Sequence, residues 1–254
     1  MVKFDIGFKA ASTANFKLFS GAIIRGFVYS VVARYNRRFA SELHASRSLA
    51  PFSTTPLFNS GGVAGGIEKG ESYSFRVVFF SSEIGEAFRD YFMKRSTIRL
   101  AGENHKIERI EVEYVNRIDE QPSSRVRVNF LTPTCFRVPS AGYRFLPLPY
   151  PPLMMRSLAR IYEGFYGRLP ENYRQWLDVH GVALAGCSIT TEKIMVKRDS
   201  WNVGFKGEAL LSLPKDAYRE DFARVTSKLL RLGCYTNVGG GRTSGMGVME
   251  VEFR

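Results

Sequence analysis

Acid–base chemistry is the first function that the residue types suggest, and His44 is the side chain best suited to it. An imidazole with an ordinary pKa of about 6.5 exchanges a proton close to neutral pH. His44 stands in SELHASRSLAPFSTTPLF, between helical sequence and a loop bounded by prolines, where a histidine can also simply end a helix. His105 and His180, the other two histidines, are predicted to be a turn residue and a helix C-terminal residue.

Tyr29 is a candidate partner for His44, but only under one geometric condition. On one straight helix the two residues would lie roughly 22 Å apart along the axis, at about 1.5 Å per residue. They can share a site only if the helix breaks and the chain folds back. The sequence allows such a break around Tyr35 and Asn36.

A glycine-rich stretch, NVGGGRTSGMG, lies close to the C-terminus at residues 237–247 and contains five glycines and Arg242. Successive exposed backbone amides can form a concave site for a phosphate. The preceding helix points its negative end at this loop, so attraction for an anion must come from the amides and Arg242. A flexible surface loop is the alternative interpretation.

The charge distribution favours a polyanionic partner. The chain carries 36 Lys and Arg against 24 Asp and Glu, a net charge of +12. Residues 222–249 contain no acid and include Arg224, Lys228 and Arg231 at helical spacing, which gathers them on one helix face. A solvated helix face is the simpler alternative.

The remaining composition excludes several classes of protein. Cys135, Cys187 and Cys234 are isolated and form no C-x-x-C pair, so we expect reduced, mostly buried thiols and no zinc site. No apolar run is long enough to span a bilayer, and the N-terminus alternates rather than forming a signal-peptide core. We therefore expect a soluble cytoplasmic protein.

Hydrophobic periodicity predicts an α+β fold in which the element order of the first half repeats in the second. Strands are expected near residues 2–8, 54–58, 73–79 and 107–118, with helices from 21 and 82. In the second half the strands are expected at 125–134, 187–198, 201–213 and 248–253, with helices within 170–184 and 216–232. Two tandem ferredoxin-like (RRM-like) βαββαβ domains, 1–122 and 123–254, are the simplest account.

Four ordered segments carry a resemblance to a known family: GAIIRGF, LHASRSLAPFSTTPLF, FLTPTCFR and GCYTNVGGGRTSGMGVMEVEF. Together they resemble the CRISPR-associated repeat-processing endoribonucleases, the Cas family numbered six, of the repeat-associated (RAMP) superfamily. The last segment is the most specific, and the resemblance covers essentially the whole chain. It implies the two ferredoxin-like domains.

The resemblance also implies an activity: metal-independent cleavage of precursor CRISPR RNA within each repeat. The 2′-hydroxyl attacks the adjacent phosphorus and leaves 2′,3′-cyclic phosphate and 5′-hydroxyl ends. Where family members use a Tyr–His–Lys arrangement, Tyr29 and His44 match the first two places. The chain departs at the third, since no lysine follows His44 before Lys69. Arg47 could supply the positive charge there, although arginine is a poor acid or base.

By the same resemblance, one set of residues would bind the repeat RNA in a cleft between the domains, with no cofactor or metal. The set is Arg25, Lys228, Arg231, Gly239, Gly240, Gly241, Arg242 and Ser244. CRISPR effector subunits are a further expected partner, and the sequence leaves open whether the chain forms a homodimer. No membrane partner is expected.

Two alternatives stay open. A non-catalytic RAMP subunit, which binds guide RNA as a scaffold in an effector complex, would share the fold and the glycine-rich loop but would not need His44. A tandem RRM-type protein would present sheet aromatics for base stacking in a K/R-G-F/Y motif. No such motif occurs in the sequence.

Overall fold

The computed structural model describes residues 1–35, 49–138, 144–198 and 200–254 of the chain. These residues divide into two compact units. Unit 1 comprises Met1–Asn116, Met195–Trp201 and Thr243–Gly245; unit 2 comprises Arg117–Ile194, Asn202–Arg242 and Met246–Arg254. Each unit is described separately below.

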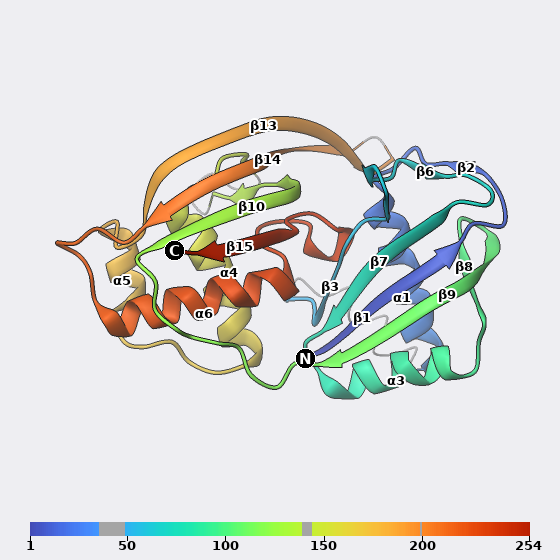
Figure 1. Ribbon diagram of the computed structural model, residues 1–254, viewed down its shortest axis with the longest axis horizontal. Coiled ribbons are helices and arrows are strands. Elements are labelled where there is room, and N and C mark those ends of the chain that lie inside the picture. The colour runs from blue at the N-terminus through green and yellow to red at the C-terminus, as the bar shows by residue number, and fades with distance from the viewer. Residues whose placement is uncertain (36–48, 139–143, 199) are drawn as a thin grey trace. The chain divides into compact units, whose positions relative to one another are not determined.

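Unit 1 is a sheet with two helices, α1 and α3, against one face (Figure 1). Its elements are β1 (Val2–Lys9), β2 (Ala14–Asn15), α1 (Ser20–Tyr35), β3 (Phe52–Thr54), β4 (Phe58–Asn59), β5 (Gly62–Val63), β6 (Gly66–Ile67), β7 (Ser72–Phe79), α3 (Ser82–Met93), β8 (Thr97–Leu100) and β9 (Glu103–Tyr114). Among the described residues, seven strands join in the order β5-β4-β7-β1-β9-β8, with β3 also paired to β7. β1 is antiparallel to both of its neighbours.

The core of unit 1 forms where the apolar face of the sheet meets the helices. Strict alternation in β1 buries Val2, Phe4, Ile6 and Phe8 on this face. The Phe88 ring of α3 lies 5.0 Å from the Phe4 ring and 4.9 Å from the Phe79 ring, between ring centroids. Phe27 of α1 joins the same cluster through edge-to-face contacts with Phe75 and Phe88. Contacts of this kind suit the aromatic quadrupole, so a phenylalanine cluster fixes both helices on the sheet.

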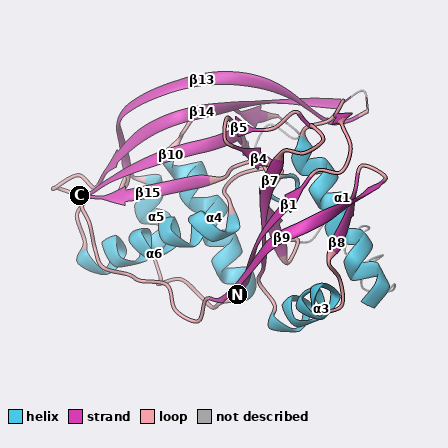
Figure 2. Cartoon of the chain, turned by 45° about the vertical axis from the view of Figure 1, so that its right-hand side comes forward, coloured by secondary structure: helices cyan, strands magenta, loops and turns pink. Residues whose placement is uncertain are grey.

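Unit 2 repeats the arrangement, with α4 and α6 against one face of a four-stranded sheet (Figure 2). Its elements are β10 (Arg125–Thr134), β11 (Phe136–Arg137), β12 (Phe145–Leu146), α4 (Pro151–Phe165), α5 (Tyr173–Asp178), β13 (Ala183–Lys197), β14 (Ser200–Ser212), α6 (Glu220–Thr236), the 3-10 helix η2 (Arg242–Ser244) and β15 (Met249–Phe253). The strand order β13-β14-β10-β15 places the first and last strands of the βαββαβ unit side by side, and β10 pairs antiparallel with β14 and β15. The expected α+β class with two ferredoxin-like folds is confirmed.

The position of one helix was predicted wrongly. The sequence placed the first helix of the second half within 170–184, but the helix that packs on α6 is α4, and only the short α5 lies in the predicted range. Pro151 and Pro152 open α4 at its first two positions. Proline is well tolerated in the first turn because that backbone nitrogen needs no helical partner. The proline-rich run therefore starts a helix that it was expected to precede.

Two short segments from later in the chain complete unit 1. The Phe19 backbone amide donates a hydrogen bond to the Met195 carbonyl at 2.8 Å. The Thr54 hydroxyl donates to the Thr243 carbonyl at 3.0 Å. The tip of the β13–β14 hairpin and the tip of the glycine-rich stretch are thus structural parts of unit 1. No helix in the described part of the chain combines the length and apolar character needed to cross a lipid bilayer.

Candidate nucleic-acid interface

Tyr29 and Arg25 lie one turn apart on α1 and contact each other. The Arg25 guanidinium carbon lies 5.3 Å from the centroid of the Tyr29 ring, within the range of a cation–π interaction. The same ring meets Phe52 of β3 edge to face, with 5.6 Å between centroids. Tyr29 is half-buried, so its ring is held on two sides.

His44 and Arg47 lie outside the described residues, which resume at Leu49. The contact between Phe52 and Tyr29 nevertheless constrains the path of the chain. It shows that the chain, after leaving Tyr29 along α1, has returned to that ring by Phe52. His44 precedes Phe52 by eight residues (52 − 44). The proximity of His44 to Tyr29 stays a prediction, but the return that it requires is present in unit 1.

The glycines of the C-terminal stretch mainly allow close packing. Gly247 has a φ of +73°, and a Cβ there would come within 1.8 Å of the Val238 carbonyl oxygen. Gly245 has a φ of +76°, and its Cβ would meet the Pro56 nitrogen at 2.5 Å. Both positions require glycine because of conformation and space. Most of this stretch is buried; of its glycines only Gly241 is exposed, with Gly239 and Gly240 half-buried.

The expectation that the loop amides are exposed for a phosphate is wrong at two positions. The Gly239 amide donates to the Ser157 hydroxyl at 3.0 Å. The Gly240 amide donates to the Cys135 carbonyl at 2.9 Å. Both amides therefore already have acceptors within unit 2, one on α4 and one at the residue that follows β10. An anion at this turn would have to displace those contacts or approach Gly241.

Arg242 and Ser244 are also more enclosed than the sequence suggested. Arg242 is only 8% exposed, and its guanidinium donates to the Thr236 carbonyl at 3.4 Å. Burial, together with the nearby charge of Arg160, lowers the pKa of Arg242 to about 10. Ser244 is buried, with its carbonyl oxygen 2.0 Å from where a Cβ on Gly21 would stand. Neither side chain projects from the loop as an exposed contact.

The basic face of α6 is largely paired with acids. Lys228 Nζ lies 2.9 Å from Glu120, and Arg231 lies 3.3 Å from Asp119. The hydrogen bond from Lys228 lowers the pKa of the Glu120 carboxyl and raises the pKa of Lys228. Arg231 also stacks on Phe253, with its guanidinium carbon 3.9 Å from the ring centroid. Carboxylates from residues 119 and 120, which lie outside the acid-free stretch 222–249, therefore oppose the positive charge of this face.

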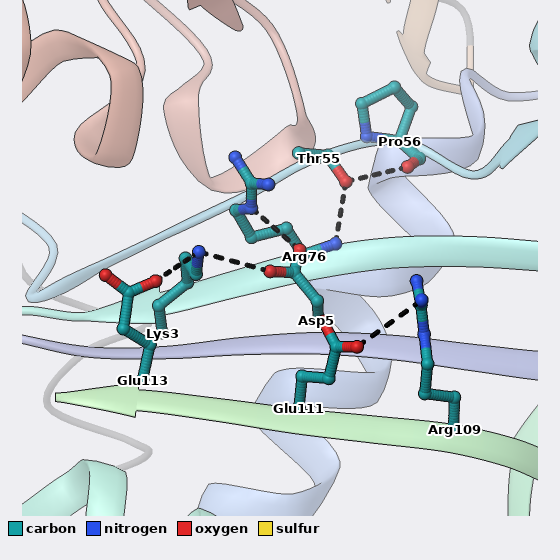
Figure 3. Close-up of polar contacts among 8 residues, drawn as sticks. All are labelled: Lys3, Asp5, Thr55, Pro56, Arg76, Arg109, Glu111 and Glu113. Carbon is teal, nitrogen blue, oxygen red and sulfur yellow. Dashed lines mark hydrogen bonds and ion pairs between the residues drawn. The ribbon is translucent and has the colours of Figure 1, made fainter.

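A further group of charges, which the sequence did not single out, lies on the face of the unit 1 sheet opposite the helices (Figure 3). Arg76 Nε donates to Asp5 at 2.8 Å, and Lys3 Nζ lies 3.4 Å from the same carboxylate and also pairs with Glu113. Arg109 pairs with Glu111 at 3.4 Å on β9. The alternation of apolar and charged side chains along β1 and β9 was the sequence pattern that could have identified this group. The three cations of this group, Lys3, Arg76 and Arg109, are matched by three carboxylates, so the group has no excess of positive charge.

Comparison with known proteins gives one family. The family model described as CRISPR-associated endoribonuclease Cas6 matches residues 128–249. None of the curated proteins compared with the chain matches it. Within the described ranges, no group of three or more His, Cys, Asp or Glu side chains that could hold a metal ion occurs.

Several solved structures similar to this chain are Cas6 or Cas6-related proteins. The product complex of Cas6 (TTHB231) from Thermus thermophilus superposes with a TM-score of 0.81 at 18% identity, covering 99% of this chain and 98% of that one. The product complex of Cas6 (TTHA0078) gives 0.75 at 22% identity, covering 99% and 100%. A Cas6-related protein from Pyrococcus furiosus gives 0.63 at 11% identity, covering 99% and 98%. At these identities the likeness establishes the fold.

Proposed function

From the premise that this chain belongs to the CRISPR-associated endoribonuclease Cas6 family, we propose that it cuts precursor CRISPR RNA within the repeats. The family match is the observation that carries the proposal. The similar structures support it, since two of those proteins are product complexes and one of them is also known as a substrate mimic complex. The net charge of +12 fits a polyanionic substrate.

The proposed reaction is an internal transesterification that needs no metal. A base removes the proton of the 2′-hydroxyl, whose oxygen then bonds to the adjacent phosphorus. The bond from phosphorus to the 5′-oxygen breaks, and an acid protonates that oxygen. The products are a 2′,3′-cyclic phosphate and a 5′-hydroxyl, with no net oxidation or reduction. Acid, base and a cation near the phosphorane suffice for this chemistry.

His44 is the proposed acid or base, with Tyr29 beside it and Arg47 as the cation. The support from unit 1 is the contact of Tyr29 with Phe52, which shows the chain back at the tyrosine shortly after the His44 segment. Arg25, stacked on the Tyr29 ring, would supply a second positive charge near the same phosphate. Arg47 keeps its proton and therefore acts only by charge.

Because Arg242 and Ser244 are buried, we propose that these two residues support the RNA contacts of unit 2 from within the loop. The turn at Gly239, Gly240 and Gly241 would form the surface that the strand approaches, with Arg242 beneath it adding positive potential. Ser244 would act by fixing the loop tip. Lys228 and Arg231 would bind phosphates in place of Glu120 and Asp119, the carboxylates they now hold.

The test is cleavage of end-labelled repeat RNA in the presence of EDTA, with the ends of the products identified. We expect cutting at one position in the repeat and a cyclic phosphate on the upstream product. Intact RNA that stays bound would support the non-catalytic scaffold instead. Cleavage only after a divalent cation is restored would contradict the metal-independent mechanism.

A second experiment assigns the site. His44→Ala should reduce the cleavage rate by about 100-fold or more, the scale of general acid–base catalysis, and leave RNA binding nearly unchanged. His180→Ala is the matched control, since His180 is exposed in unit 2 and should not affect the rate. Undiminished cutting by His44→Ala would place the chemistry elsewhere.

A further inference from the structure

Phe145 is a large apolar side chain that unit 2 leaves exposed beside its glycine turn, residues 239–241. The side chain is 42% exposed, whereas Phe130, Phe136, Phe205 and Phe222 of the same unit are buried. A single exposed ring is ordinary on a protein surface, so the groups around it decide whether it has a role. Around Phe145 these groups are glycine backbone and arginine side chains.

The hairpin of β11 and β12 holds the ring against the glycine turn. Phe145 is the first residue of β12. A Cβ on Gly240 would come within 3.2 Å of Cε1 of the Phe145 ring. The Gly240 amide donates to the carbonyl of Cys135, the residue before β11, which ties the turn to the base of the hairpin. Glycine at position 240 therefore lets the ring lie directly against the backbone of the turn.

The charges around the ring are positive. Arg137 lies directly opposite Phe145 in the β11–β12 pair, so the two side chains stand on the same face of the hairpin. Arg137 and its neighbour across the turn, Arg144, are both exposed. Two segments without any Asp or Glu, residues 121–162 and 222–249, meet where the hairpin contacts the glycine turn.

An exposed aromatic ring among cations has the chemistry of a stacking site for single-stranded nucleic acid. In such sites a base lies flat on the ring while positive side chains bind the phosphates of the same strand. Phenylalanine has no hydrogen-bonding group, so the contact uses the face of a base and not its edge. Only an unpaired base offers that face freely, because bases within a duplex are covered by their neighbours.

We propose that Phe145 binds the repeat RNA by stacking on one unpaired base, while Arg137 and Arg144 bind adjacent phosphates. This inference rests on the proposed function for its ligand, the repeat RNA, but it does not require that the RNA is cut. It gives a main role in affinity to a residue outside the set that the sequence indicated.

The test is the affinity of the chain for labelled repeat RNA. A 2′-deoxyribose on the nucleotide before the cut keeps the strand intact, and unmodified RNA serves if the wild-type chain does not cut. Phe145→Ala should weaken binding about 5- to 150-fold, the range measured for one base–aromatic stack. Phe145→Trp keeps an aromatic face and should bind like the wild type, whereas Phe145→Leu should lose most of the affinity.

Two controls separate stacking from other effects. The ring carries no charge, so the salt slope of binding should be the same for the wild type and Phe145→Ala. Tyr218→Ala removes another exposed aromatic side chain of unit 2, which precedes α6 and lies at the opposite end of that helix from the glycine turn. It should leave the affinity unchanged.

A second arm changes the RNA, so that the result does not depend on how well Phe145→Ala folds. Bases of the repeat are removed one at a time, leaving abasic sugars. At one unpaired position, the loss of the base should weaken binding to the wild type as much as Phe145→Ala does. The same abasic strand should bind Phe145→Ala no more weakly than the complete strand does.

The outcomes distinguish this inference from the proposed function. Wild-type affinity in Phe145→Ala, or abasic effects that are the same in both proteins at every position, would overturn the stacking contact and leave cleavage unaffected. Coupled effects on an RNA that is never cut would contradict the proposed cleavage and support the stacking contact. A wild-type chain that does not bind repeat RNA would contradict both.

Discussion

At the scale of single residues, the glycines of the C-terminal stretch are structural requirements that can be tested one at a time. Gly245→Ala should destabilise the protein by at least about 1–2 kcal/mol, because alanine is unfavourable at positive φ and its Cβ would overlap Pro56. Urea denaturation measures this. The control is Gly26→Ala on the exposed side of α1, where no atom lies within 4 Å of the new Cβ. That change should stabilise by about 0.5–1 kcal/mol.

Arg242 is the residue for which burial changes the expected experiment most. Loss of a direct phosphate contact would flatten the salt dependence of RNA binding by about 0.7 per single-stranded phosphate. Since the guanidinium is buried against the Thr236 carbonyl, we expect Arg242→Ala to lower stability by about 1–3 kcal/mol and to change the slope by less than that amount. If the salt slope instead decreased by the full amount expected for one phosphate, with the melting temperature unchanged, Arg242 would be shown to contact the RNA directly.

At the scale of elements, α6 and the segment before β10 form one ionic unit. Neutralising Asp119 and Glu120, as Asp119→Asn with Glu120→Gln, should release Arg231 and Lys228 for phosphates. RNA affinity should rise, and the salt slope should steepen by up to about 1.4 for two single-stranded phosphates. The cost in stability should be small, at most about 1 kcal/mol for each exposed pair.

The control for this pair must change the net charge equally. Glu86→Gln with Asp90→Asn does so on α3, where both carboxylates pair with Arg89. If that variant steepened the salt slope as much as the α6 variant, the change in net charge alone would explain the effect. The proposal that Lys228 and Arg231 bind phosphates would then be contradicted.

At the scale of the whole molecule, unit 1 depends on two segments that lie far along the chain. A fragment of residues 1–122, the predicted N-terminal domain, lacks Met195–Trp201 and Thr243–Gly245. It would lose the partners of the Phe19 amide and the Thr54 hydroxyl and expose the tightly packed Gly21. We expect the fragment to unfold at a clearly lower temperature than the full chain, and co-expression with 123–254 to restore it. A cooperative transition at the full-length temperature would contradict this dependence.

Local sequence patterns predicted some elements of the fold correctly and others wrongly. Alternating hydrophobicity correctly predicted the strands β1, β7 and β15, and amphipathic spacing correctly predicted the helices α3 and α6. Both patterns arise because one face of the element is buried, and both can be read from neighbouring residues. The same local rules misplaced α4, since prolines that end one helix also begin another. His105 was read as a turn residue, yet it is fully buried on β9 and its ring nitrogen accepts a hydrogen bond from the Ala11 amide. That partner lies 94 residues away, so no local pattern indicated it.

The sequence by itself predicted the two ferredoxin-like folds and the resemblance to the Cas6 family, and it contained the residue types from which a cleavage site could be built. Only the tertiary structure decided which of the predicted contacts are open to a ligand. It buried Arg242, gave the amides of Gly239 and Gly240 partners, and paired Lys228 and Arg231 with acids. The physical reason is that accessibility depends on what the rest of the chain packs against a residue. The sequence of a charged or glycine-rich segment shows which residue types it contains, but not which residues of the folded chain pack against it.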